Sequence, residues 1–166
     1  MGWRMVGLLV EGQIPDGVLA ALPGSPGPVG LPSPGDEALS MSLDADYAVA
    51  EVGDWTVVSD PRVQVVWTSG MCESLSRGNR RVLGFMVDNL TTTHGFVWHA
   101  GGRLVRRTLY VEGEPADQVG DPLPEEEGLP GPWSEDRVPA LAYRLTGVGL
   151  GDLLDASYIV LRGDDR

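Results

Sequence analysis

The side chains that most often carry enzyme chemistry are few in this chain. There are two histidines, His94 and His99, and a single cysteine, Cys72. The histidines lie five positions apart in a stretch with the composition of a strand, and an odd spacing puts two side chains on opposite faces of a strand. They would meet at one metal only if the strand broke between them, at Gly95, and without a cysteine pair a zinc site would also need carboxylates. We therefore predict no metal site and no cofactor.

Cys72 is predicted to be a structural residue rather than a nucleophile. It lies with Met71 and Leu75 on the apolar side of a short predicted helix, which is typical of a buried thiol. A reactive cysteine would need a neighbouring base, and no serine of the chain stands in the Gly-x-Ser-x-Gly arrangement of a hydrolase elbow. No catalytic residue is predicted, although an enzyme whose site uses His94, His99 or Cys72 remains an alternative.

The segment 147–151 (GVGLG) shares only its glycines with a nucleotide-binding loop. Such a loop follows a strand and opens a long helix, whereas this segment follows a predicted helix. The chain also contains no lysine, so it lacks the Gly-Lys-Ser/Thr sequence of a phosphate-binding loop. We interpret these glycines as a helix end and a turn.

Two features are candidates for binding a partner. Trp133 stands between a proline-rich segment and a predicted helix, and aromatic anchors dominate the energetics of many interfaces. Its alternative role is a staple that pins the preceding loop onto the domain, which we favour slightly. Glu125, Glu126 and Glu127 form an acidic run that is either a docking patch or an ordinary solvated loop.

The charge balance narrows the classes of partner. The net charge is −12, with 24 acidic residues against 12 basic ones, all of them arginine. An acidic surface repels phosphate backbones and anionic lipids, so we expect neither nucleic acid nor membrane as a ligand. A basic protein partner is favoured as a ligand, and the alternative is that acidity serves solubility alone. No apolar run approaches the roughly 20 residues that span a bilayer and no secretory pattern opens the sequence, so a cytoplasmic location is predicted.

Length and periodicity predict a single domain, 1–166, of the α+β class: a mainly antiparallel sheet with two or three short helices packed on one face. Surface loops are expected near 23–35, which is rich in proline and glycine, and near 112–132, which is acidic and proline-rich. The expected strands are 3–10, 47–52, 55–58, 63–67, 81–87, 95–99, 103–111 and 158–161. The expected helices are 15–22, 69–76, 136–145 and a short turn at 151–154.

Two of these elements carry more detailed expectations. Strict alternation in 103–111 places Leu104 on one face together with Arg106, and neither face is cleanly apolar, so this strand is expected to be half exposed or at an edge. The helix 136–145 is expected to be capped by Asp136 and to end at Gly147.

Five short motifs resemble a group of small actinobacterial proteins of unknown function. They are 53–57 (GDWTV), 75–78 (LSRG), 102–106 (GRLVR), 121–126 (DPLPEE) and 145–148 (LTGV). The members of that group share a GDWT strand, a GRLVR hairpin arm, a PLPEE loop and a helix ending in LTGV, in this order. The resemblance extends roughly from Trp55 to Leu154 and omits the proline-rich loop. It implies a bacterial, cytoplasmic protein and assigns no activity and no catalytic residue.

These observations favour a non-enzymatic protein-interaction module, of the kind formed by an immunity protein or an inhibitor that binds a basic partner. The alternatives are a structural or assembly component of a phage or bacterial particle, and an enzyme with an unrecognised site. The sequence leaves the identity of the partner and the oligomeric state open.

Overall fold

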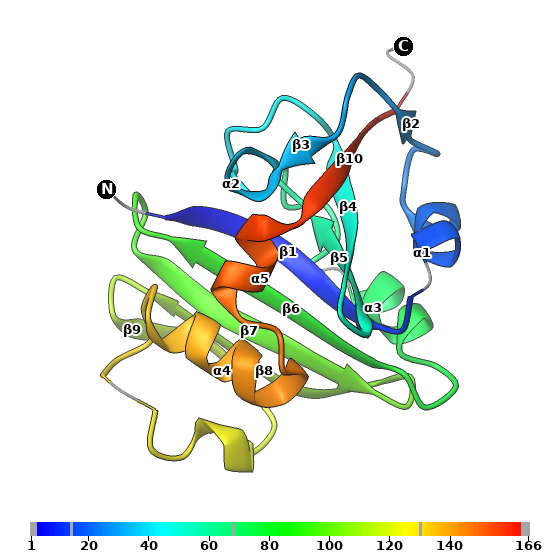
Figure 1. Cartoon of the computed structure of the whole chain (residues 1–166). Coiled ribbons are helices and arrows are strands. Elements are labelled where there is room, and N and C mark those ends of the chain that lie inside the picture. Colours follow the sequence, from blue (N-terminus) through cyan, green and yellow to red (C-terminus); the bar gives the residue numbers. More distant parts are fainter. Residues whose placement is uncertain (1–2, 14, 68, 130, 164–166) are drawn as a thin grey trace.

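Within the residues that the structure describes (3–13, 15–67, 69–129 and 131–163), ten β-strands form one open antiparallel sheet in this computed structural model (Figure 1). The order across the sheet is β2-β10-β4-β5-β1-β6-β7-β8-β9, and β3 also pairs with β10. The strands are β1 (Arg4–Glu11), β2 (Gly27–Pro28), β3 (Ser33–Pro34), β4 (Tyr47–Val52), β5 (Trp55–Ser59), β6 (Arg81–Asp88), β7 (Thr93–Ala100), β8 (Arg103–Val111), β9 (Glu114–Val119) and β10 (Ser157–Arg162). The predicted α+β class with a mainly antiparallel sheet is confirmed.

β1 lies inside the sheet, between β5 and β6, and is buried on both faces. Its side chains alternate between two cores: Met5 and Leu9 enter one, and Val6, Leu8 and Val10 enter the other. Because both faces of this strand are covered, its sequence is a nearly continuous apolar run instead of an alternating one.

The helices contribute to both cores. They are α1 (Pro15–Ala21), α2 (Gly35–Ala38), α3 (Ser69–Leu75), α4 (Arg137–Thr146), α5 (Leu150–Asp155) and the 3₁₀ helix η1 (Pro124–Glu126). Buried residues of α2, α4 and α5 belong to the first core, here the α4 core, and those of α1 and α3 to the second, here the α3 core. The prediction of two or three helices on one face is therefore not confirmed. No helix among the described residues is long and apolar enough to cross a bilayer.

α4 has the predicted apolar stripe but a different cap. Its buried residues are Val138, Leu141, Ala142 and Leu145. The helix ends, as predicted, at Gly147, whose φ of 77° suits a residue without Cβ. The carboxylate of Asp136 makes no capping hydrogen bond. Instead Ser134 Oγ accepts the backbone N–H groups of Asp136 and Arg137, at 3.3 and 3.2 Å.

Both predicted surface loops contain short strands. The segment 23–35 includes β2 and β3, which pair with β10 at the edge of the sheet, a position where proline costs no ladder hydrogen bond. The segment 112–132 includes β9 and η1. β9 is exposed at four of its six positions and its composition is polar, so its sequence carries little strand signal although its backbone pairs with β8.

The predicted strand 63–67 is wrong, because this segment is a turn-rich connection. The buried carboxylate of Asp60 accepts the backbone N–H groups of Gln64, Val65 and Val66, at 2.8, 2.8 and 3.1 Å. These bonds use the donors that a strand would need for its ladder. Val65 and Val66 are nevertheless buried in the α3 core, which explains their apolar character.

A β-bulge in β8 changes the predicted side-chain directions. Trp98 of β7 pairs with Arg106, while the next residue, His99, pairs with Leu104, so Val105 is the additional residue. Leu104 therefore packs against the α3 core, whereas Arg106 lies on the face of the α4 core beside Trp98. The prediction that Leu104 and Arg106 share a face is wrong for this reason.

Candidate functional site

The two histidines lie on opposite faces of β7, as their spacing predicts. His94 pairs with Val87 of β6, a residue of the α4 core. His99 pairs with Val82 of the α3 core. The strand continues without a break between them, so the two imidazoles do not meet. No group of three or more histidine, cysteine or acidic side chains in the described part of the chain is arranged to hold a metal ion.

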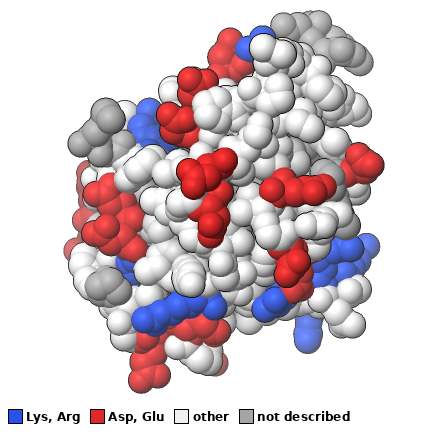
Figure 2. Space-filling model, in the orientation of Figure 1, with Lys and Arg blue, Asp and Glu red and all other residues white. Residues whose placement is uncertain are grey.

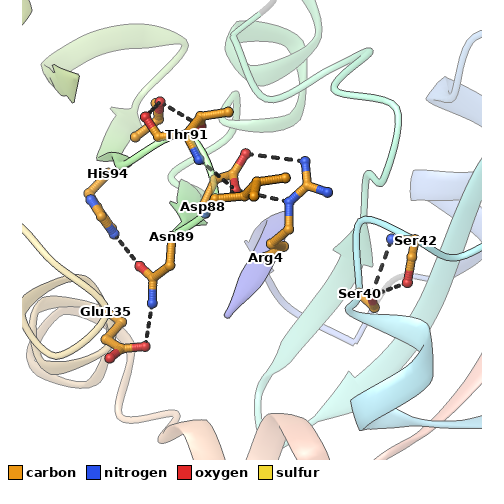
Figure 3. Close-up of polar contacts among 10 residues, drawn as sticks. Arg4, Ser40, Ser42, Asp88, Asn89, Thr91, His94 and Glu135 are labelled. Carbon is orange, nitrogen blue, oxygen red and sulfur yellow. Dashed lines mark hydrogen bonds and ion pairs between the residues drawn. The ribbon is translucent and has the colours of Figure 1, made fainter. Parts of the chain in front are cut away.

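His94 belongs to a hydrogen-bonded chain at the turn between β6 and β7 (Figure 3). Its Nε2 lies 2.7 Å from Asn89 Oδ1, and Asn89 Nδ2 donates to Glu135 at 2.5 Å. Because the amide group of Asn89 donates to Glu135, its oxygen must accept, so the proton of neutral His94 is on Nε2. Burial lowers the pKa of His94, although Glu135 and Asp88 act in the opposite direction. This series of hydrogen bonds connects the β6–β7 turn to the segment before α4.

Asp88, next to Asn89, fixes the same turn (Figure 3). Its carboxylate accepts Arg4 Nε at 2.9 Å and the backbone N–H groups of Leu90 and Thr91. Burial alone would raise the pKa of Asp88, but these hydrogen bonds outweigh it and hold the pKa below its usual value. The carboxylate is thus ionised and fully used in holding the turn.

His99 and Cys72 both lie on the side of the sheet that carries the α3 core, and burial leaves neither of them in a catalytic arrangement. His99 is 1% exposed, and neither of its ring nitrogens has a hydrogen-bond partner among the described residues. Burial lowers its pKa, with Glu73 raising it and Arg107 lowering it to a smaller extent. Cys72 is fully buried, with Sγ 3.8 Å from the carbonyl oxygen of Val65. Burial, with the nearby carboxylates of Asp60 and Glu73, raises the pKa of Cys72 to about 12, so the thiol is protonated at neutral pH.

A buried ion pair holds the acidic segment 120–127 onto β8. Arg106 donates through Nε and Nη2 to the two carboxylate oxygens of Glu126, each at 3.1 Å, and both side chains are less than a tenth exposed. Arg106 Nη1 also donates to the carbonyl oxygen of Gly120 at 2.9 Å. Glu126 accepts the backbone N–H of Leu123 at 2.5 Å. Glu126 therefore has a structural role that its place in an acidic run did not indicate.

The other two residues of the run remain nearer the surface. Glu125 is half-buried and Glu127 is exposed. Their backbone carbonyls accept Arg144 Nη1 of α4 at 3.0 and 2.5 Å, which ties this segment to the helix. Binding of a partner by Glu125 and Glu127 stays a prediction.

Trp133 is a buried staple. It is 9% exposed and belongs to the α4 core. Its ring centroid lies 5.2 Å from that of Phe96 and 6.4 Å from that of Tyr110. The guanidinium carbon of Arg137 lies 4.5 Å from the same ring. This packing supports the staple role, since little of the indole is left for a partner to cover.

The staple and the ion pair line an open hollow of about 580 Å³, here called the clamp hollow. It is lined by Arg106, Tyr110, Pro122, Leu123, Pro124, Glu126, Glu127, Trp133 and Arg137. Three of the four predicted partner-binding residues, Trp133, Glu126 and Glu127, thus meet at one place.

A second hollow, of about 430 Å³, lies between the β4–β5 turn and α5 and is here called the α5 hollow. Three exposed carboxylates, those of Glu51, Asp152 and Asp155, line it, and no arginine is among its described lining residues. Asp152 also accepts the backbone N–H of Gly149 at 2.9 Å. Sequence reasoning missed this group because Glu51 is a hundred positions from α5 and only the packed fold brings them together.

Acidic charge dominates the surface because the chain has 24 acidic residues and only 12 arginines. Within the described residues, six arginines pair with carboxylates of the chain itself: Arg4, Arg62, Arg81, Arg106, Arg107 and Arg162. Figure 2 shows acidic side chains spread over the face that carries α4 and α5, with arginines mainly along its lower edge. This face is electronegative and would attract cations.

No family model, curated protein or solved structure matches the chain. The resemblance to the actinobacterial group therefore stays a prediction.

Proposed function

We propose that this chain is a non-enzymatic, cytoplasmic protein-interaction module that binds a basic protein, as an immunity protein or an inhibitor does. The observation that carries the proposal is the α5 hollow, where Glu51, Asp152 and Asp155 surround a concave surface without an arginine in its described lining. The net charge of −12 gives the whole molecule the same sign.

The α5 hollow suits the end of an arginine or lysine side chain. A hollow of about 430 Å³ accommodates such a group, and exposed carboxylates need little reorganisation to pair with it. Individually each exposed pair contributes only about 0.2–1 kcal/mol. Together, complementary charges accelerate association and make it sensitive to salt. Glu125 and Glu127 add negative charge beside α4, whose Arg144 holds their backbone.

The test is capture of a partner from the native host at low salt. The protein is compared with a variant that removes the three charges of the hollow, Glu51→Gln, Asp152→Asn and Asp155→Asn. The asparagine at 152 keeps an oxygen for the N–H of Gly149. A matched control removes three exposed carboxylates elsewhere, Glu112→Gln, Glu114→Gln and Asp121→Asn.

We expect the parent and the control to capture the same basic protein, with binding that weakens as salt is added, and the hollow variant to lose it. Capture of nothing at low salt, or equal capture by the hollow variant, would refute the proposal.

The open edge of the sheet argues against the alternative function, a structural component of a phage or bacterial particle. β9 carries Pro115, Glu114 and Asp117, and proline and charge at an edge disfavour pairing with another strand. Light scattering at high protein concentration decides between the two, since an assembly component would associate with itself.

A further inference from the structure

Arg137 is a guanidinium without a counter-ion in a chain that has 24 acidic residues. Within the described residues no carboxylate forms an ion pair with it, although six other arginines have one. It is half-buried, its Nε is buried without a hydrogen-bond partner, and Nη1 donates to the carbonyl oxygen of Gly131 at 2.5 Å. Stacking on Trp133 at 4.5 Å fixes the guanidinium in place.

This cation also stands where a cation is unfavourable. Arg137 is the first residue of α4, and the peptide dipoles of a helix give its N-terminus a partial positive charge that favours anions. The exposed carboxylate of Asp136, the residue before the helix, already offsets part of this positive charge but forms no ion pair with Arg137. A bound anion would compensate the guanidinium itself.

The clamp hollow opens beside this guanidinium and has room for a ligand. Its second guanidinium, that of Arg106, is already neutralised by Glu126, so it neither repels Arg137 strongly nor competes for an anion. Tyr110, whose ring packs against Trp133, also lines the hollow, and Pro122, Leu123 and Pro124 supply apolar walls. Glu127 is exposed at the same hollow and acts against an anion.

We propose that the clamp hollow binds the carboxylate group of a ligand with an apolar body, with Arg137 as its counter-ion. A planar guanidinium matches a carboxylate in two parallel hydrogen bonds, and one unpaired guanidinium suits a single negative charge better than a phosphate dianion. The apolar body lies against Leu123 and its neighbouring prolines. This site is separate from the α5 hollow and does not depend on the proposed function.

The experiment is a titration of the isotope-labelled protein followed by nuclear magnetic resonance. The probes are N-acetyl-L-leucine, which mimics a peptide C-terminus, and 4-methylpentanoate, which is a small organic acid of similar shape. N-acetyl-L-leucinamide serves as the neutral control and inorganic phosphate as the competing anion. The reporters are the indole N–H of Trp133 and the backbone N–H of Leu123, which lie at the hollow.

We expect saturable shifts of both reporters with the carboxylates, with a Kd of about 1 mM for a single charged contact, and none with the amide or with phosphate. Tighter binding of N-acetyl-L-leucine identifies a peptide terminus as the source of the carboxylate, and equal binding identifies a small acid. No saturable shift at tens of millimolar, or equal shifts with the amide, would overturn the proposal. A phosphate response that exceeds the carboxylate response would overturn it as well.

Variants that are expected to weaken or to strengthen carboxylate binding sharpen the test. Arg137→Gln is expected to weaken carboxylate binding by about tenfold or more, and Arg137→Lys to weaken it less, since the charge stays but the fork is lost. Glu127→Gln is expected to strengthen it by about two- to fivefold. Arg103→Gln removes an exposed charge from β8 outside the hollow and should leave binding unchanged. Undiminished binding by a folded Arg137→Gln protein would refute the role of this residue.

Discussion

Removal of the Glu126 carboxylate should destabilise the protein more than most single changes. In Glu126→Ala the guanidinium of Arg106 keeps its bond to Gly120 but loses two charge-assisted bonds of 3.1 Å, and the N–H of Leu123 loses its acceptor. Breaking a buried pair by deleting one partner costs about 3–5 kcal/mol. Because Arg106 lines the clamp hollow and water can reach it there, we expect about 3 kcal/mol, the lower end of that range.

A double variant separates the loss of the pair from the cost of a stranded charge. Arg106→Met with Glu126→Leu removes both charges and leaves apolar groups of similar length against the α4 core. Such replacements are often neutral or stabilising, but the carbonyl oxygen of Gly120 and the N–H of Leu123 each lose a partner, at about 1 kcal/mol apiece. We therefore expect the double variant to be about 1 kcal/mol more stable than Glu126→Ala.

Urea unfolding of the parent, single and double variants measures these free energies. Hydrogen exchange at the backbone N–H of Leu123 shows whether the loss is local, since release of the 120–127 segment should speed exchange there first. A cost below about 1 kcal/mol for Glu126→Ala, or a double variant as unstable as the single one, would refute the view that this pair fastens the segment.

Three further predictions concern the interior. Burial lowers the pKa of His99, so below about pH 6.5 the unfolded chain takes up a proton that the folded chain does not. The free energy of unfolding therefore falls as pH falls. His99→Leu should reduce this dependence on pH, which urea unfolding at about pH 7.5 and about pH 5.5 measures. Cys72, whose pKa is raised to about 12, should react with a thiol reagent only when the protein unfolds, and labelling in buffer as fast as in urea would contradict its burial. Gly95→Ala should cost about 2 kcal/mol or more, because a Cβ there would lie 2.2 Å from the carbonyl oxygen of Thr108. Gly70→Ala in the first turn of α3, where nothing lies within 4 Å of the new carbon, should instead change stability by no more than about 0.5 kcal/mol, and thermal unfolding compares the two glycines.

The parts of the fold that local sequence determines were predictable. The β4–β5 hairpin follows from two alternating runs joined by Gly53-Asp54. The stripe and the end of α4 follow from helical periodicity and Gly147. In each case the residues that specify the element are close together in the chain, so a single window contains the information.

The parts that depend on distant partners were not predictable. β2, β3 and β9 form because β10 and β8 offer unpaired edges, and their own residues have little strand propensity. The bulge at Val105 inserts one residue and exchanges the faces of the side chains on either side of it. The candidate site divides in the same way: the run 125–127 is visible in sequence, whereas the pairing of Glu126 with Arg106 and the exposed position of the α5 hollow need the tertiary structure.

β10 connects segments that are made at very different times during translation. It pairs with β2, β3 and β4, and the contact between Arg162 and Asp44 spans 118 positions. Until β10 leaves the ribosome, β4 has an open edge and its buried side chains, such as Tyr47, lack part of their cover. Closure of so long a loop is slow, so nascent chains that lack β10 should be the species that chaperones retain and proteases remove.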